Sequence, residues 1–203
     1  MTDLTLDHLV YAAPDLAVAV ADVARRAGVE PVPGGPHVGL GTRNFLLGLG
    51  DSAYLEIVGP DPDQPDPDVP RPFGVDELTA PALVGWAVAT ADIEASVARS
   101  RESGYDPGPV RDMSRRRPDG ELLEWRLTPP ITGLVPFLID WGDAPHPAAA
   151  LPVVPLVSFE AVHPEPGAIR ADLAALGAEL SVREGPEDAL IARLQGREGV
   201  VTL

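Results

Sequence analysis

The most constraining feature of this chain is an order of predicted elements that occurs twice, about eighty residues apart. An apolar run, an amphipathic helix and three further strand-like runs fill residues 4–58, and the same order returns in residues 82–141. Self-similarity at a fixed interval is the signature of a repeated structural unit. The sequence therefore predicts an α+β fold built from paired βαβββ modules.

Apolar runs bounded by turn residues indicate strands, and apolar residues at helical spacing indicate helices. Asp15 is a possible helix N-cap, and Gly28 follows two arginines as a stop signal. Asp92 and Gly104 have the same roles in the second module. The predicted strands are residues 4–13, 36–44, 45–49, 53–58, 82–89, 108–114, 121–127 and 134–141, and the helices are residues 15–27 and 92–103.

Two further segments complete the predicted organisation. Residues 59–72 alternate proline with aspartate. The prolines cannot donate to a continuous backbone ladder and the aspartates repel one another, so a linker or exposed loop is expected. Residues 154–194 contain a strand, a helix and two short strands, typical of a partial third module. The predicted division is residues 1–60, the linker 61–80, residues 81–145, and a third module, residues 146–203, packed on the same domain.

Charge and composition exclude several classes of function. The formal net charge is −16, so phosphate backbones and anionic membranes are repelled, and neither nucleic acid nor membrane is an expected partner. All 15 basic residues are arginine, and cysteine is absent, which removes lysine Schiff bases and thiolate chemistry. No Gly-x-Gly-x-x-Gly opens a helix, so no nucleotide cofactor is expected. The N-terminus carries acid where a signal peptide needs positive charge, which predicts a cytoplasmic protein.

Six short segments carry a resemblance to a known family. They include Leu-Asp-His-Leu-Val at residues 6–10, the glycine-rich residues 34–44 and Tyr-Leu-Glu-Ile-Val-Gly-Pro at residues 54–60. The others are residues 113–120, 123–127 and 136–142. In this order and spacing the chain resembles the glyoxalase-like domain of the vicinal oxygen chelate superfamily, which includes glyoxalases, bleomycin-resistance proteins and extradiol dioxygenases. The resemblance implies a mixed sheet curled into a cup around the active site, completed within one chain or across a homodimer.

The resemblance also implies a metal pair. A first-strand histidine and a fourth-strand carboxylate bind a divalent cation in that superfamily, and here these positions are His8 and Glu56. A mixed imidazole and carboxylate set suits zinc, manganese, iron or nickel. Two other interpretations stay open: Glu56 on the wetted face of a half-buried strand, and His8 as a hydrogen-bonded core residue.

His37 is predicted to lie in the pocket. It shares a strand face with Gly39 and Gly41, which leave room for close approach. Three strands of flat sheet would separate it from the first strand by about 14 Å, so a role as third metal ligand is secondary to acid/base chemistry or substrate contact. A solvent-exposed histidine is the alternative. Asn44, in the same segment, is a further candidate for substrate contact.

The second module departs from the metal pattern. Trp86 stands where the first module has His8, and Asp140 is one position away from the place of Glu56, which can turn it to the other face. Both are candidate substrate contacts, because indole favours a flat or apolar ligand, although a core position is the more common one for tryptophan. Arg115 and Arg117 could fork onto a substrate carboxylate, or could belong to a solvated turn.

Three functions compete at this stage. The first is a metal-assisted lyase, isomerase or dioxygenase acting on a small carbonyl or vicinal-oxygen compound, neutral or anionic, with Glu56 or His37 moving a proton. The second is a metal-free small-molecule binding or sequestering protein of the bleomycin-resistance type, which Trp86 favours. The third is a structural or regulatory partner domain, which fits the acidic surface but leaves the histidine and glutamate positions unexplained.

Overall fold

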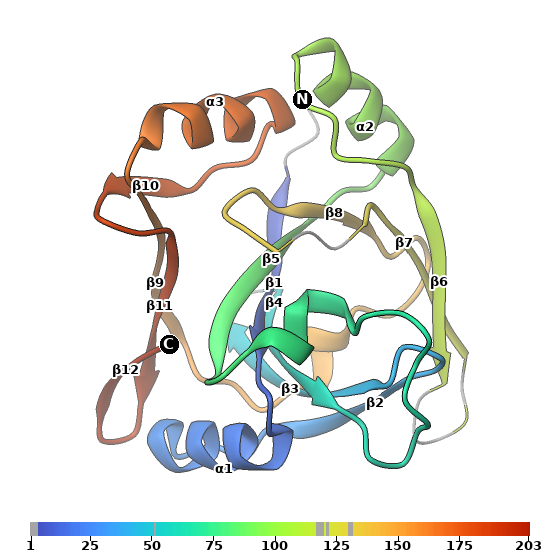
Figure 1. The fold of residues 1–203 in the computed structure, drawn as a ribbon, viewed down its shortest axis with the longest axis vertical. Coiled ribbons are helices and arrows are strands. Elements are labelled where there is room, and N and C mark those ends of the chain that lie inside the picture. Colours follow the sequence, from blue (N-terminus) through green and yellow to red (C-terminus); the bar gives the residue numbers. More distant parts are fainter. Residues whose placement is uncertain (1–3, 51, 117–119, 121, 130–131) are drawn as a thin grey trace.

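The chain folds around two β-sheets (Figure 1). A computed structural model describes residues 4–50, 52–116, 120, 122–129 and 132–203. Within these residues, one mixed sheet has eight strands and a second sheet has four. The larger sheet has the order β2-β3-β4-β1-β5-β8-β7-β6. The predicted α+β fold with a cupped mixed sheet is confirmed.

Each half of the larger sheet comes from one βαβββ unit. The first unit contains β1 (Thr5–Ala12), α1 (Leu16–Ala27), β2 (Val32–His37), β3 (Thr42–Gly50) and β4 (Ala53–Pro60). The second contains β5 (Ala82–Ala89), α2 (Ile93–Glu102), β6 (Arg111–Arg116), β7 (Leu122–Leu127) and β8 (Phe137–Asp140). Two short 3-10 segments lie outside the units, η1 (Pro72–Glu77) and η2 (Pro147–Ala150).

The helices begin where the sequence predicts. The Asp15 carboxylate accepts a hydrogen bond from Val18 N at 3.0 Å, and Gly28 closes α1 in the left-handed conformation. Asp92 accepts from Ala95 N at 3.0 Å at the start of α2. Such side chains satisfy amide groups that have no partner in the first turn of a helix. Among the described residues, no helix is long and apolar enough to cross a membrane.

The two units join along their first strands and curl. β1 pairs antiparallel with β5, and each of these strands pairs parallel with the last strand of its own unit, β4 or β8. The end strands β2 and β6 contact each other, so the sheet curls almost to closure. One chain therefore supplies both halves of the cup.

Hydrophobic side chains pack on both faces of this sheet. Alternation along β1 sends Leu9 and Tyr11 toward α1 and the C-terminal sheet, in the larger cluster of buried side chains. Val10 and Ala12 face the inside of the cup, where they pack with Phe137 and its neighbours. The inner face is thus apolar except where polar side chains interrupt it, and those side chains form the site.

The predicted strand 36–44 is wrong. β2 ends at His37, Leu40 N donates to His37 O at 3.0 Å, and β3 begins at Thr42. Gly39 and Gly41 have φ of 79° and 63°, left-handed values that extended strands do not use. The glycines therefore form the turn between two strands, and His37 lies at its edge.

The proline- and aspartate-rich segment packs against this turn. Gln64 accepts from Gly39 N at 3.1 Å and donates to Thr42 O at 3.1 Å. Arg71 Nε donates to Gly41 O at 3.0 Å. The segment was expected to be a linker or exposed loop; its side chains are mostly exposed, but its polar groups anchor it beside the cup.

The C-terminal residues form the separate four-stranded sheet. Its elements are β9 (Leu156–His163), α3 (Pro166–Leu176), β10 (Ser181–Glu184), β11 (Ala189–Gly196) and β12 (Gly199–Thr202). β12 is absent from the sequence prediction. The element order is that of the other units, but the pairing differs: β9 is parallel to β10, its neighbour in the chain, and the strand order is β10-β9-β11-β12.

Candidate active site

A β-bulge in β1 positions the first two polar residues of the candidate site. Leu6 pairs with Val88 and His8 pairs with Ala87, so Asp7 is an extra residue opposite β5. In a regular strand, consecutive side chains point to opposite faces. The bulge brings the carboxylate of Asp7 beside the imidazole of His8, whose Nδ1 lies 2.6 Å from Asp7 Oδ1.

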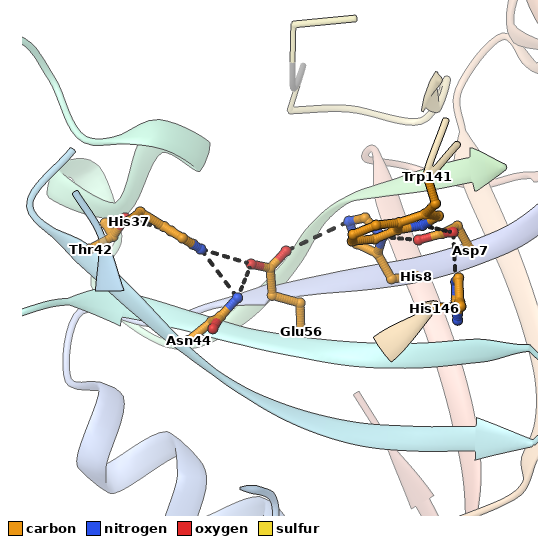
Figure 2. Close-up of polar contacts among 8 residues, drawn as sticks. All are labelled: Asp7, His8, His37, Thr42, Asn44, Glu56, Trp141 and His146. Atoms are coloured by element: carbon orange, nitrogen blue, oxygen red, sulfur yellow. Dashed lines mark hydrogen bonds and ion pairs between the residues drawn. The ribbon is translucent and has the colours of Figure 1, made fainter. Parts of the chain in front are cut away.

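Asp7 is the centre of a buried hydrogen-bond network (Figure 2). Its Oδ2 accepts from Trp141 Nε1 at 2.8 Å and lies 2.9 Å from His146 Nε2, while its side chain is fully buried. Burial alone would raise the pKa of Asp7, but hydrogen bonds and charge from His146 and His8 outweigh it and lower the pKa to about 2. Asp7 is therefore a carboxylate that orients His8.

Glu56 lies on the inner face of the cup, where His8 also points. Val10 is the register partner of Glu56 on β1, and His8 is two residues away on the same face. His8 Nε2 lies 3.6 Å from Glu56 Oε2, and Glu56 is 7% exposed. Glu56 does not lie on a wetted strand face, the alternative to a metal ligand, because its side chain is buried.

His37 approaches Glu56 from the opposite side (Figure 2). Its Nε2 lies 3.6 Å from Glu56 Oε1, and Asn44 Nδ2 donates to the same oxygen at 2.7 Å. β2 lies three places from β1 as expected, but the sheet is curled and not flat, so His37 and His8 reach the same carboxylate. Thr42 Oγ1, 2.9 Å from His37 Nδ1, holds the ring in this position.

The hydrogen-bond pattern assigns the protons of both imidazoles. Each Nδ1 bonds to a neighbour in its own segment, Asp7 for His8 and Thr42 for His37. Since His8 Nδ1 donates to Asp7, the Nε2 lone pair of His8 faces Glu56. His37 Nε2 lies 3.2 Å from Asn44 Nδ2, an amide nitrogen that only donates, so this Nε2 accepts and Nδ1 carries the proton of His37. A distance of 3.6 Å is too long for a hydrogen bond. Asn44 Nδ2 bridges His37 Nε2 and Glu56 Oε1, whereas the facing electron pairs of His8 Nε2 and Glu56 Oε2 are stabilised by a proton or a cation between them.

The donor set of His8 and Glu56 fits a divalent cation. Metal-binding histidines usually donate their other ring N–H to a carboxylate, as His8 does to Asp7. His37 faces the other oxygen of Glu56, and within the described residues no three His, Cys, Asp or Glu side chains form a group that could hold a metal ion. A cation here would have two protein ligands and open positions for substrate oxygens or water.

The polar groups lie at the wall of a small aromatic cavity. The cavity has a volume of about 90 Å³ and is lined by His37, Asn44, Tyr54 and Glu56, with Phe73, Met113, Trp125, Phe137 and Trp141 among its apolar residues. A largely apolar cavity with a few converging polar groups is typical of small-molecule sites. Trp125 and Trp141 both line this cavity.

Trp86 and Asp140 lie outside the cup. The indole of Trp86 is buried on the opposite face of β5, where it donates to Leu134 O at 2.9 Å and packs on Phe159. Asp140 Oδ2 accepts from Ile93 N at 3.3 Å, at the start of α2. Their prediction as substrate contacts is wrong for this cavity, because a shift of one residue reverses the face of a strand.

The two arginine candidates are not placed by the structure. The backbone of Arg115 pairs with Leu123 at the end of β6, and its side chain is not described. Arg117 lies outside the described residues. Substrate binding by either arginine stays a prediction.

Sequence reasoning missed the network behind His8. Asp7 had one available signal, an acidic residue next to a histidine inside an apolar strand. His146 had none, because it comes from the segment before η2, far along the chain, and reaches Asp7 only through folding. The hydrogen bond from Trp141 Nε1 to Asp7 likewise required the structure.

A curled sheet of paired βαβββ units with polar groups on its inner face is the architecture that the resemblance to the vicinal oxygen chelate superfamily predicts. A family model described as a glyoxalase-like domain matches residues 6–177. The chain therefore belongs to the glyoxalase-like domain family. A comparison with curated proteins gives no match.

Several solved structures are similar to this chain at low sequence identity. A hypothetical protein from Staphylococcus aureus has a TM-score of 0.64 and 14% identity, over 93% of this chain and 90% of that one. Methylmalonyl-CoA epimerase from Mycobacterium tuberculosis has a TM-score of 0.45 and 22% identity, over 74% of this chain and 95% of that one. A variant of the Streptomyces coelicolor epimerase, in complex with 2-nitronate-propionyl-CoA, has a TM-score of 0.45 and 20% identity, over 70% and 98%. The first of these supports the fold alone.

Proposed function

We propose that this protein is an enzyme that moves a proton at the carbon next to a carbonyl group of a small compound bound in the cup. The observation that carries the proposal is the setting of Glu56. Its carboxylate is buried, receives a hydrogen bond from Asn44 at 2.7 Å, and lies 3.6 Å from the Nε2 atoms of His8 and His37. Proton transfer by a positioned carboxylate or imidazole is the ordinary means of enolisation. An isomerase or lyase is therefore the proposed class, and a dioxygenase is not required by this arrangement.

The proposed step uses the residues of the cup in distinct roles. Glu56 accepts the proton as the carbon–hydrogen bond breaks, and the electron pair moves to the carbonyl oxygen to form an enolate. His37 Nε2 is positioned to exchange that proton with Glu56, and Asn44 keeps the carboxylate in place. Return of the proton to the other carbon or the other face completes an isomerisation. The apolar walls exclude water, which strengthens electrostatic interactions within the site.

A divalent cation held by His8 and Glu56 would polarise the carbonyl oxygen and stabilise the enolate charge. Zinc, manganese, iron and nickel all suit an imidazole and carboxylate pair. Asp7 would keep the Nε2 lone pair of His8 directed at the cation by holding the proton on Nδ1. Binding of the cation is part of the proposal.

Deuterium incorporation into small ketones tests the proposal. Protein incubated with zinc, manganese, iron(II) or nickel is mixed in D₂O with hydroxyacetone, dihydroxyacetone or 2-hydroxyacetophenone, and mass spectrometry follows exchange at the carbon next to the carbonyl. Exchange above the buffer rate is expected for at least one compound. Glu56→Gln keeps the size of the side chain and an acceptor for Asn44 but removes the base, so the rate should fall by about 10²-fold or more.

Glu124→Gln is the matched control. Glu124 lies on β7 of the same sheet with its side chain exposed on the other face from Trp125, so its substitution should leave exchange unchanged. Absence of exchange by the wild-type protein with every cation and compound would count against the proposed activity. Equal exchange by the Glu56→Gln variant would remove Glu56 from its role.

The metal-free sequestering function has lost its specific support. It rested on Trp86 in a ligand position of the cup, and the indole of Trp86 lies on the other face of the sheet. A cytoplasmic location, a monomeric or homodimeric state and the division into domains stay predictions.

A further inference from the structure

The aromatic residues of the chain are concentrated around one cavity. Phenylalanine, tryptophan and tyrosine make up only 5% of the sequence, ten residues in all. Five of them line the site cavity: Tyr54, Phe73, Trp125, Phe137 and Trp141. Together these five are called the aromatic belt below. Half of the aromatic residues of the chain therefore lie around this one cavity.

The rings of the belt are in mutual contact. Trp125 and Trp141 have centroids 5.4 Å apart with planes inclined by 37°, and Phe73 and Phe137 have centroids 6.4 Å apart. These are separations at which aromatic pairs attract each other. These two pairs of rings therefore form walls of the cavity whose positions are fixed before a ligand binds.

The imidazoles of the site connect the two pairs. His8 stacks on Tyr54 with centroids 4.8 Å apart and meets the edge of Phe137 at 5.4 Å. His146 contacts Tyr54 at 5.8 Å and Trp141 at 5.6 Å. The belt is thus continuous with the polar network behind Glu56, so a flat group resting on the belt lies beside the proposed base.

Phe73 joins the belt in an unfavourable backbone conformation. Its φ is 62° and its ψ 19°, and among the described residues it is the one non-glycine residue with positive φ. Its ring is nevertheless buried, with 9% of the residue exposed. Left-handed backbone at a bulky residue is strained, and such strain tends to persist at ligand sites. The fold therefore keeps this ring in the cavity wall at a conformational cost.

The described lining of the cavity offers mainly apolar side chains to a ligand. The chain has no lysine and a net charge of −16, and no arginine is among the described residues that line the cavity. Polar contacts are concentrated at Glu56, His37 and Asn44. Phosphate groups are usually held by arginine or lysine, and neither is among the described lining residues.

We infer that the substrate is a compact carbonyl compound with a flat, apolar body, such as a single aromatic ring or a short conjugated chain. The body rests on the aromatic belt and the oxygen-bearing end meets Glu56. A cavity of about 90 Å³ is small, which favours a compact body over an extended ring system. This inference rests on the proposed function, since it is the carbonyl group that must reach Glu56.

Binding of two matched probes tests the inference. 2-Hydroxyacetophenone and hydroxyacetone carry the same vicinal carbonyl and hydroxyl groups and differ in a phenyl against a methyl group. Isothermal titration calorimetry of the metal-incubated protein should give a Kd at least about 10-fold lower for the phenyl compound. Trp125→Leu should weaken binding of the phenyl compound by about 5-fold or more and leave hydroxyacetone unchanged. Phe73→Leu should have the same effect if Trp125→Leu does not fold.

Trp86→Phe is the control, because Trp86 is buried on the face of β5 that points away from the cavity. It should leave the binding of both probes unchanged. Equal Kd values for the two probes, or tighter binding of hydroxyacetone, would overturn the inference about the substrate body. Exchange of hydroxyacetone with no preference for the phenyl compound would leave the proposed function intact. Tight phenyl binding with no exchange of either probe would support the belt and refute the activity.

Discussion

Replacing Asp7 by asparagine should remove a pH-dependent part of the stability of this protein. Asp7 is fully buried, and its carboxylate contacts His8, His146 and the indole of Trp141. Asparagine has nearly the same shape but no charge, and it cannot accept all three contacts. The side chain of the variant should therefore fit the site while the ionic stabilisation is lost.

The magnitude follows from the shift of the Asp7 pKa. The pKa is lowered from 3.8 to about 2, although burial alone would raise it, because His146 and His8 stabilise the charged form. At about 1.4 kcal/mol per unit, the lowered pKa corresponds to about 2.5 kcal/mol of stability at neutral pH. A lowered pKa in the folded state stabilises the protein above the unfolded-state pKa. This contribution is lost as the pH falls from about 4 through 2, and less than about 0.5 kcal/mol remains at pH 2.

Urea unfolding at a series of pH values between 6 and 2 measures this effect. Both proteins are treated with a chelator, so that metal binding at His8 does not contribute. The free energy of unfolding of the wild-type protein should exceed that of Asp7→Asn at pH 6, and the difference should shrink by about 2 kcal/mol at pH 2. Asp106→Asn is the control, because Asp106 also has a lowered pKa, from hydrogen bonds to Gly108 N and Arg101, but its side chain is 65% exposed and solvent screens its charge. A difference between wild type and Asp7→Asn that is constant over the whole pH range would refute the reasoning.

Two further substitutions test the placement of residues around the cup. Asp140→Ala should lower the free energy of unfolding by about 1 kcal/mol, because Asp140 accepts a hydrogen bond from the Ile93 amide at the start of α2. The substitution should leave deuterium exchange unchanged. Loss of exchange in a folded variant would show that Asp140 takes part in the reaction. Gly59→Ala should destabilise the protein by about 1–3 kcal/mol in urea unfolding, because a Cβ would lie 2.8 Å from Ala13 O and 2.9 Å from Leu16 Cβ; an unchanged transition midpoint would show that β4 and the start of α1 can separate freely.

Local pattern was sufficient for most of the elements. Alternation of apolar residues, Asp15 and Asp92 as caps and glycine stop signals depend on residues close in sequence, and the structure has the corresponding strands and helices. The error at residues 36–44 was also local. Glycine inside an apolar run is compatible with a strand or a turn. In the structure Gly39 and Gly41 have positive φ, so the segment is a turn.

The pair at the centre of the site was within reach of the sequence. The glyoxalase-like motifs pointed to His8 and Glu56, and strand alternation kept each on a defined face once the pairing of β1 with β4 was assumed. The same alternation left the second unit ambiguous, because the face of Asp140 depends on an alignment shift of one residue.

The sequence by itself determined the repeated units, the acidic and lysine-free composition and the chemical types of the central residues, since these follow from neighbouring residues and residue identity. Only the tertiary structure decided that His37 and His8 approach the same carboxylate, that a bulge brings Asp7 to His8, and that His146 and Trp141 complete the network. These contacts depend on the curl of a sheet whose end strands meet, and on packing between segments more than a hundred residues apart. Such contacts form through the cooperative closure of long chain segments, which local periodicity does not encode.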